Sequence, residues 1–136
     1  VHLGMAIAMR GGGLVAPALL EADRKNLATL MQEFSELVTR VRTGHMRSGE
    51  FSAATITVTS LGGEGADVLY PIINPPQVAI IGAGAIRQRP WVYNGQLSVR
   101  PVLTLALAAE RGLSDGRAGS HFLNTIGLLL ASPEAL

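Results

Sequence analysis

The residues best suited to chemistry follow directly after an apolar run near the end of the chain. Residues 102–109 read VLTLALAA, which is typical of a strand buried on both faces, and the charged, glycine-punctuated turn ERGLSDG follows at 110–116. A buried strand that ends in charged side chains is a common place for a proton acceptor or an anion contact. An ordinary strand-turn-helix connection, in which the charges are only solvated, stays open as the alternative.

A second set of candidate groups lies in residues 55–59, TITVT, which alternate between polar and apolar types. The alternation of β-branched residues predicts a half-buried strand with its threonines on the solvent face. If that face instead lines a channel, Thr59 at the strand end is placed to donate a hydroxyl. Gly62 and Gly63, after Ser60 and Leu61, permit a turn.

Two glycine-rich stretches resemble phosphate-binding loops only weakly. Residues 11–13 separate two strand-like segments, so a tight hairpin is favoured over a phosphate loop, which requires a following helix. Residues 82–85, GAGA, contain half of a dinucleotide fingerprint but also lack the helix. Neither stretch predicts a nucleotide site.

Composition narrows the function classes. The chain has 136 residues, 48% of them hydrophobic and 15% charged, and this apolar balance indicates surface buried against other subunits. The net charge of +1 and the scattered arginines argue against a nucleic-acid binder. The absence of Cys excludes thiolate catalysis and zinc-cysteine sites, and we expect no metal. No apolar run is long enough to span a membrane and no signal peptide is visible, so we expect a cytoplasmic protein.

The elements that must position these groups alternate irregularly. We expect strands at 2–9, 14–16, 55–59 and 78–81, and a hairpin at Asn94-Gly95 whose return strand covers 97–109. The helical spacing of apolar residues predicts a helix from Leu27 to Val41, capped by Asp23 or Asn26 and ended by Gly44, and a second one over 118–129 before Pro133. Strands outnumber helices, which predicts an α+β fold with a mixed or antiparallel sheet and one domain over residues 1–136.

Five segments taken together resemble a known family. They are residues 13–17 (GLVAP), 55–62 (TITVTSLG), 73–77 (INPPQ), 94–96 (NGQ) and 114–116 (SDG), which keep the order and approximate spacing of the catalytic domain of lipoamide acyltransferases of 2-oxoacid dehydrogenase complexes. The resemblance implies a chloramphenicol-acetyltransferase-like mixed sheet flanked by helices, incomplete at its N-terminus, so that 1–136 is a partial acyltransferase catalytic domain. It also implies homotrimers that build a larger core, with a lipoyl domain and other dehydrogenase-complex subunits as partners.

The same resemblance implies the chemistry. Coenzyme A and a lipoyl group, both substrates, enter a channel between subunits, and a His in the pattern H-x-x-x-D-G takes the thiol proton. A thiol with a pKa of about 8.5 is only a few per cent thiolate at neutral pH, so a base is useful. Carried across, Thr59 donates a hydroxyl to the oxyanion, Asp115 and Gly116 end the catalytic pattern, and Ser60, Gly62 and Gly116 bind substrate.

One departure from the family pattern changes the expected activity. Arg111 stands four residues before Asp115, where the family has its His. Either residues 110–112 replace the family's Asp-His-Arg one for one, or the His is lost and Gly112 is inserted. In both alignments an imidazole is missing, and Arg, always protonated, cannot accept a proton.

Loss of a general base costs a factor of about 10²–10⁴ elsewhere. His121 and Glu110 are weak candidates for a substitute base, because the motif does not place His121 and a carboxylate is a poor base for a thiol. Three hypotheses therefore stand: an impaired acyltransferase, a non-catalytic core or scaffold protein of the same fold, and a truncated product whose uncovered sheet edges favour aggregation.

Overall fold

The computed structural model describes residues 1–9, 11–46 and 48–135. Its strands are β1 (Leu3–Met5), β2 (Ile7–Ala8), β3 (Leu14–Val15), β4 (Ala18–Leu19), β5 (Ile56–Ser60), β6 (Ala79–Ala83), β7 (Arg87–Tyr93), β8 (Gln96–Val102) and β9 (Leu105–Ala109). Its helices are α1 (Leu27–Thr43), α2 (Ser48–Ser52) and α3 (Gly116–Ala131), with short 3₁₀ turns η1 (Ala22–Arg24), η2 (Gly62–Glu64) and η3 (Pro133–Ala135).

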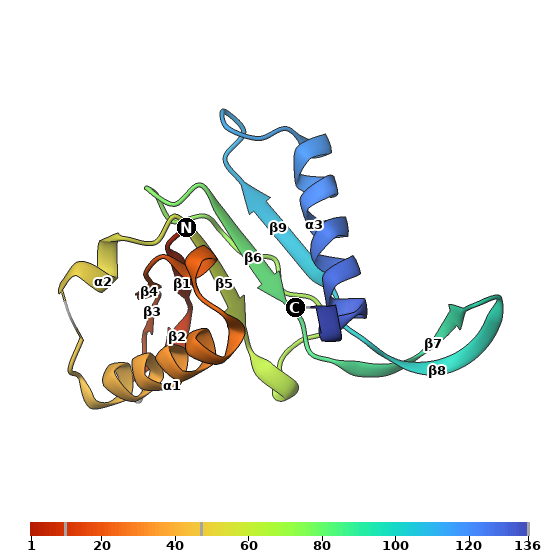
Figure 1. The fold of residues 1–136 in the computed structure, drawn as a ribbon, viewed down its shortest axis with the longest axis horizontal. Helices are drawn as coiled ribbons and strands as arrows, with labels where there is room; N and C mark the ends of the chain where they lie inside the picture. The colour runs from red at the N-terminus through yellow and green to blue at the C-terminus, as the bar shows by residue number, and fades with distance from the viewer. Residues whose placement is uncertain (10, 47, 136) are drawn as a thin grey trace.

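Five strands form one mixed sheet in the order β4-β1-β5-β6-β9. β1, β5 and β6 run parallel, while β4 and β9 pair antiparallel at the two edges. As Figure 1 shows, α1 lies by the β1–β4 end and α3 runs beside β9 at the other. The expectation of an α+β fold with a mixed sheet and flanking helices is confirmed.

The first helix forms where the apolar spacing predicts it. The side chain of Asn26, not that of Asp23, caps α1 by accepting from the Thr29 N–H at 2.8 Å, and Gly44 adopts the left-handed conformation at its C-terminus. The helix buries Leu37 and Val41 against Ile7 and Leu19, which form the core at this end of the sheet.

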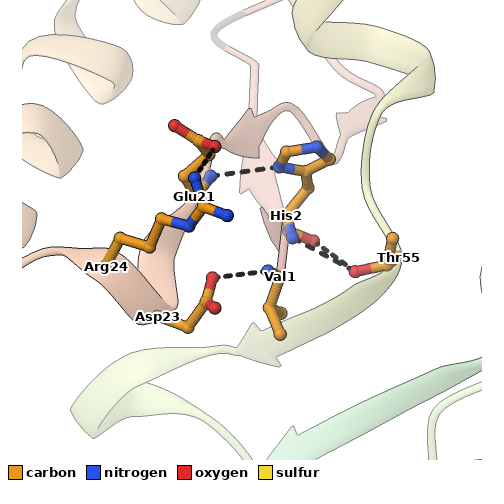
Figure 2. Close-up of polar contacts among 6 residues, drawn as sticks. All are labelled: Val1, His2, Glu21, Asp23, Arg24 and Thr55. Carbon is orange, nitrogen blue, oxygen red and sulfur yellow. Dashed lines mark hydrogen bonds and ion pairs between the residues drawn. The ribbon is translucent and has the colours of Figure 1, made fainter.

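A cluster of hydrogen bonds and ion pairs holds the start of β1 to its neighbours, as Figure 2 shows. The Glu21 N–H donates to Nδ1 of His2 at 3.0 Å, and the hydroxyl of Thr55 both accepts from the His2 N–H and donates to the His2 carbonyl. The ammonium group of Val1 donates to Oδ1 of Asp23 at 2.5 Å. These contacts tie β1, the turn before η1 and the approach to β5 together.

The Asn94-Gly95 hairpin is confirmed. Asn94 and Gly95 both have positive φ values, 50° and 75°, as a type I′ turn requires, and β7 pairs with β8 from Tyr93–Gln96 to Arg87–Val102. In Figure 1 this hairpin projects away from the five-stranded sheet. The tight turn at residues 11–13 is confirmed too, because Ile7 pairs with Val15 and Ala8 with Leu14 on either side of it.

Three expectations about strands were wrong. The return strand over 97–109 is two strands, because Val102 ends the ladder with β7 and the chain changes partner to β6 at Leu105. For the same reason the apolar strand at 102–109 begins only at Leu105, and it is a half-buried edge strand. The segment 2–9 is likewise divided into β1 and β2, which pair in different sheets.

The threonine face of β5 is also not a solvent face. Thr57 is only 1% exposed, and its hydroxyl donates to Oε1 of Gln77 at 2.7 Å. A Cβ on Gly4 would lie 2.2 Å from the Thr57 oxygen, so β1 fits beside this side chain only because residue 4 has none. Thr57 is therefore a core residue, while Thr59 is half-buried.

The GAGA stretch serves packing. A Cβ on Gly82 would lie 2.2 Å from the Leu69 carbonyl oxygen, and one on Gly84 would lie 2.0 Å from that of Asp67. The loop before β6 thus crosses the strand at backbone contact distance, which supports the rejection of a dinucleotide site.

Candidate functional site

A cleft of about 740 Å³ that is open to solvent lies between β9 and the first half of α3. Three of the candidate residues, Arg111, Asp115 and Gly116, lie in its wall. The other lining residues are Leu107, Ala109, Ser114, Gly119, Ser120, Leu123 and Asn124.

The turn that carries Arg111 is fixed by backbone hydrogen bonds. The Glu110 N–H donates to the Val78 carbonyl at 2.9 Å, which holds the end of β9 to the start of β6. The Glu110 carbonyl then accepts from the N–H groups of Leu113 and Ser114 at 3.1 and 3.0 Å. Arg111 is therefore presented at a defined point, although its own side chain is exposed.

Asp115 has a structural role that the sequence reasoning missed. Its Oδ1 accepts from the Ala118 N–H at 2.8 Å, so it is the N-cap of α3. Its carbonyl accepts from the Gly119 N–H at 3.1 Å. The helix needs a residue with a capping oxygen at this position, whether or not that residue also takes part in the reaction. The sequence signal for this role was an Asp directly before the helical run.

Small residues on α3 shape the cleft. A Cβ on Gly119 would lie 3.2 Å from Cδ2 of Leu107 on β9, so the helix approaches the strand closely at this point. Gly119, Ser120, Leu123 and Asn124 follow Gly116 at steps of three and four residues, which places them on one helix face. This spacing was visible in the sequence, but the helix was predicted from a different set of positions, Ala118, Phe122, Ile126 and Leu129.

The two alternative bases do not line the cleft. His121 and Glu110 are exposed, and neither side chain is among the residues in its wall. The polar residues that do line the cleft are Arg111, Ser114, Asp115, Ser120 and Asn124.

The remaining candidates lie around a smaller pocket at the other end of the sheet. Ser60 and Gly62 line this pocket of about 250 Å³ together with Gly63, Ala83, Gly84, Ile86 and Leu103. The Ser60 hydroxyl accepts from the Gly62 N–H at 3.1 Å, which closes the turn after β5. Thr59 directly precedes Ser60 and pairs with Gly82 on β6.

The strand register separates the two groups of candidates. Thr59 is level with Gly82, and Gly82 is level with Ala106 near the start of β9. Arg111 follows five residues later along the chain, about 17 Å away if it continued as a strand. One copy of the chain therefore brings Arg111, Asp115 and Gly116 together, and Thr59, Ser60 and Gly62 together, but not the two groups.

Comparison with known proteins identifies the family. A model of the 2-oxoacid dehydrogenases acyltransferase (catalytic domain) family matches residues 1–136. The chain therefore belongs to this family, and the resemblance noted from its motifs is confirmed.

Relatives and solved structures agree with this assignment. The dihydrolipoyllysine-residue acetyltransferase component of the pyruvate dehydrogenase complex of Staphylococcus epidermidis is 39% identical over 124 residues, and that of Staphylococcus aureus is 38% identical over the same length. In both cases the match covers 91% of this chain and 29% of the relative. The chain thus spans less than a third of these proteins.

The fold matches solved acyltransferase structures. The dihydrolipoamide acetyltransferase of Azotobacter vinelandii, examined for the roles of a serine, a histidine and an asparagine in catalysis, superposes with a TM-score of 0.90 at 32% identity, covering 99% of this chain and 55% of that one. A truncated catalytic core of the 2-oxoacid dehydrogenase complex from Thermoplasma acidophilum gives 0.80 at 28%, covering 97% and 57%. The chain therefore has the fold of somewhat more than half of each of these solved chains.

None of the helices in the described part of the chain is long and apolar enough to cross a membrane.

Proposed function

We propose that this protein is an acyltransferase of a 2-oxoacid dehydrogenase complex that moves an acyl group between dihydrolipoamide and coenzyme A. The observation that carries the proposal is the placement of the candidate residues in two groups at opposite ends of one sheet. A site that needs both groups is completed only when a second copy of the chain joins its Thr59 end to the Arg111 end of the first. We place coenzyme A and the lipoyl group, as substrates, in the channel so formed.

The spacing of three residues supports this assignment. In the Azotobacter vinelandii enzyme the histidine follows the serine by 52 positions, and the asparagine follows the histidine by 4. Thr59, Arg111 and Asp115 are separated by the same two intervals. The two alignments give the same intervals, because the second one loses the His and gains Gly112, so the spacing places Arg111 at this position of the pattern in either case.

Each residue then has a role that its geometry allows. Thr59 donates its hydroxyl to the oxyanion formed when a thiol attacks the acyl thioester. Ser60 and Gly62 shape the pocket beside it. Asp115 caps α3, which begins at Gly116 directly after the turn that presents Arg111. Since Arg cannot accept a proton, transfer is expected to be slower than with an imidazole, by a factor of about 10²–10⁴.

Exposed apolar surface supports assembly into a homotrimer or a larger core. Trp91 is 53% exposed, Leu97 75% and Leu128 74%, and the β7–β8 hairpin and α3 carry further exposed apolar side chains. A monomer with this much apolar surface is at risk of aggregation, and association covers it. A lipoyl domain and the other subunits of a dehydrogenase complex are the proposed partners; a cytoplasmic location stays a prediction.

An acyl-transfer assay tests the proposal. The purified protein is given acetyl-dihydrolipoamide and coenzyme A, and acetyl-coenzyme A is measured. We expect slow transfer that rises about 10²–10⁴-fold in Arg111→His, which restores the base. Arg117→His is the matched control, because Arg117 is exposed on the first turn of α3 and does not line the cleft. No rise in Arg111→His, with the fold intact by circular dichroism, would count against the assignment.

A non-catalytic core protein of the same fold is the second candidate. It is favoured by one observation: the polar wall of the cleft holds a guanidinium where the reaction needs a proton acceptor. Light scattering combined with coenzyme A titration separates the candidates. A trimer or larger particle that does not bind coenzyme A supports a scaffold.

A further inference from the structure

Arg111 brings to the cleft a guanidinium that has no ion-pair partner among the described residues. Within the ranges that the structure describes, its guanidinium takes part in no ion pair or hydrogen bond, although it lines the cleft wall. Asp115 is the one carboxylate in that wall, and one of its oxygens is bound to the Ala118 N–H. Ser114, Ser120 and Asn124 are uncharged. The cleft therefore offers a cation and hydrogen-bond donors to a ligand.

The start of α3 adds positive potential on the same side. Gly116 lines the cleft as the first residue of a helix of 16 residues. The first N–H groups of a helix lack acceptors within it, and the helix dipole is positive at this end; Asp115 accepts those of Ala118 and Gly119 and its carboxylate offsets part of this potential. Together with Arg111, this makes the cleft suited to an anion rather than to a neutral group.

We propose that Arg111 binds the attacking sulfur of the substrate as a thiolate, so that this protein stabilises the nucleophile by charge where its relatives are expected to remove the proton with a base. The inference rests on the proposed acyl transfer and specifies how its site works without an imidazole. An opposite charge within about 4–6 Å favours the ionised form of a thiol. Arg holds such a charge at every physiological pH and presents several N–H donors in a fixed plane.

The reaction balances without a protein base. The thiol of coenzyme A loses its proton to water, and the thiolate is held by Arg111. Its sulfur attacks the carbonyl carbon of the acyl-dihydrolipoamide thioester, forming a carbon–sulfur bond and an oxyanion that accepts the hydroxyl hydrogen bond of Thr59 from a neighbouring copy. The intermediate collapses, the bond to the lipoyl sulfur breaks, and the departing dihydrolipoamide thiolate takes a proton from water.

The pH dependence of transfer distinguishes this mechanism from general-base catalysis. With Arg111 the rate follows the ionisation of the thiol and rises with pH until the bound thiol is fully ionised. With an imidazole at the same position the rate follows the ionisation of the base, near a pKa of about 6.5, and exceeds that of the natural protein.

The thiolate can be observed directly, because the chain contains no Cys and every thiolate signal comes from the ligand. Coenzyme A is added to the purified protein, its ultraviolet thiolate absorbance is recorded against pH, and desulfo-coenzyme A serves as the reference. We expect the pKa of the bound thiol to fall by about one unit, which means roughly tenfold more thiolate at neutral pH.

Variants assign the effect to Arg111. Arg111→Gln should abolish the shift, Arg111→Lys should keep most of it, and Arg117→Gln, the matched control on the next exposed cation, should leave it unchanged. All of these side chains are exposed, so the fold should tolerate each change.

Failure of this inference and failure of the proposed function give different results. If coenzyme A binds and acyl transfer proceeds, but the thiol ionises alike in the natural protein and in Arg111→Gln, the thiolate role is wrong and the proposed function stands. If coenzyme A does not bind and no transfer is seen even in Arg111→His, both are overturned.

Discussion

Thr59 and Arg111 lie at opposite ends of the same sheet. Thr59 is level with Ala106 through Gly82, whereas Arg111 follows the far end of β9, where the Glu110 N–H donates to Val78. Five residues, about 17 Å in an extended strand, separate Ala106 from Arg111 along the chain, more than side-chain rotation can bridge. Any reaction that uses both residues therefore takes them from two copies of the chain.

The acyl-transfer activity should depend on the hydroxyl group of Thr59. In the Arg111→His background, where transfer is fast enough to measure well, Thr59→Ala should lower kcat about 10²–10³-fold, as loss of an oxyanion donor does elsewhere. Thr59→Ser should retain most of the activity, because it keeps the hydroxyl. Equal losses in both variants would show that the side chain acts by packing.

Asp115 should act first through the helix that it caps. Asp115→Ala removes the acceptor of the Ala118 N–H and should lower the free energy of unfolding by about 1 kcal/mol, while Asp115→Asn should preserve it. In the Arg111→His background the Ala variant should lose activity and the Asn variant keep it, because the turn stays in place. A large activity loss in the Asn variant, with stability unchanged, would indicate a role for the charge itself.

The close crossing at Gly84 should make this position intolerant of any side chain. Gly84→Ala places a Cβ where the Asp67 carbonyl lies, and we expect a loss of about 1–3 kcal/mol or more in denaturant unfolding. Gly127→Ala is the matched control: no atom outside α3 lies near it, and Ala favours helix over Gly by about 1 kcal/mol. A tolerated Gly84→Ala would mean that the loop does not cross β6 at this distance.

The sequence predicts the local elements well and their partners poorly. Asn94-Gly95 and the apolar spacing of α1 are local signals, and both elements form where expected. The exchange of partner between β8 and β9 depends on pairings with β7 and β6, and local composition carries no information about it. Thr57 appeared solvent-exposed from alternation alone, yet a parallel neighbour on each side and Gln77 bury it.

In the candidate site, too, the sequence predicts the individual residues but not how they are arranged relative to one another. The motifs located Arg111, Asp115, Ser60 and Gly62, and the structure places each at the end of a strand or helix. That the two groups stand at opposite ends of the sheet follows from strand register, which no motif contains. Whether these residues act together stays a prediction.

Acid should weaken the contact at the start of β1 in a chain that begins at Val1. The hydrogen bond from the Val1 ammonium, followed by one from the backbone of Asp23 itself, lowers the pKa of the Asp23 carboxyl below its usual range. A lowered pKa in the folded state stabilises the fold above the unfolded pKa of about 3.9, and this contribution is lost as the pH falls through the folded value.

Acetylation of the Val1 amino group should remove most of this pH dependence: it should lower stability slightly at neutral pH, slightly because both groups are exposed, and leave stability in acid unchanged. Unfolding midpoints measured between about pH 5 and pH 2 test the expectation. An acetylated chain with the same acid profile as the free one would show that another group is responsible.

Subunit mixing tests most directly whether Thr59 and Arg111 meet across copies. The unmodified protein has Thr59 but no base, and the double variant Thr59→Ala with Arg111→His has the base but no hydroxyl. Co-expressed in equal amounts, they should place Thr59 beside the introduced imidazole in about one site in four if subunits mix at random. Transfer should then rise to about a quarter of that of Arg111→His alone, far above either protein by itself. A mixture no more active than the average of its two components would contradict a site shared between subunits.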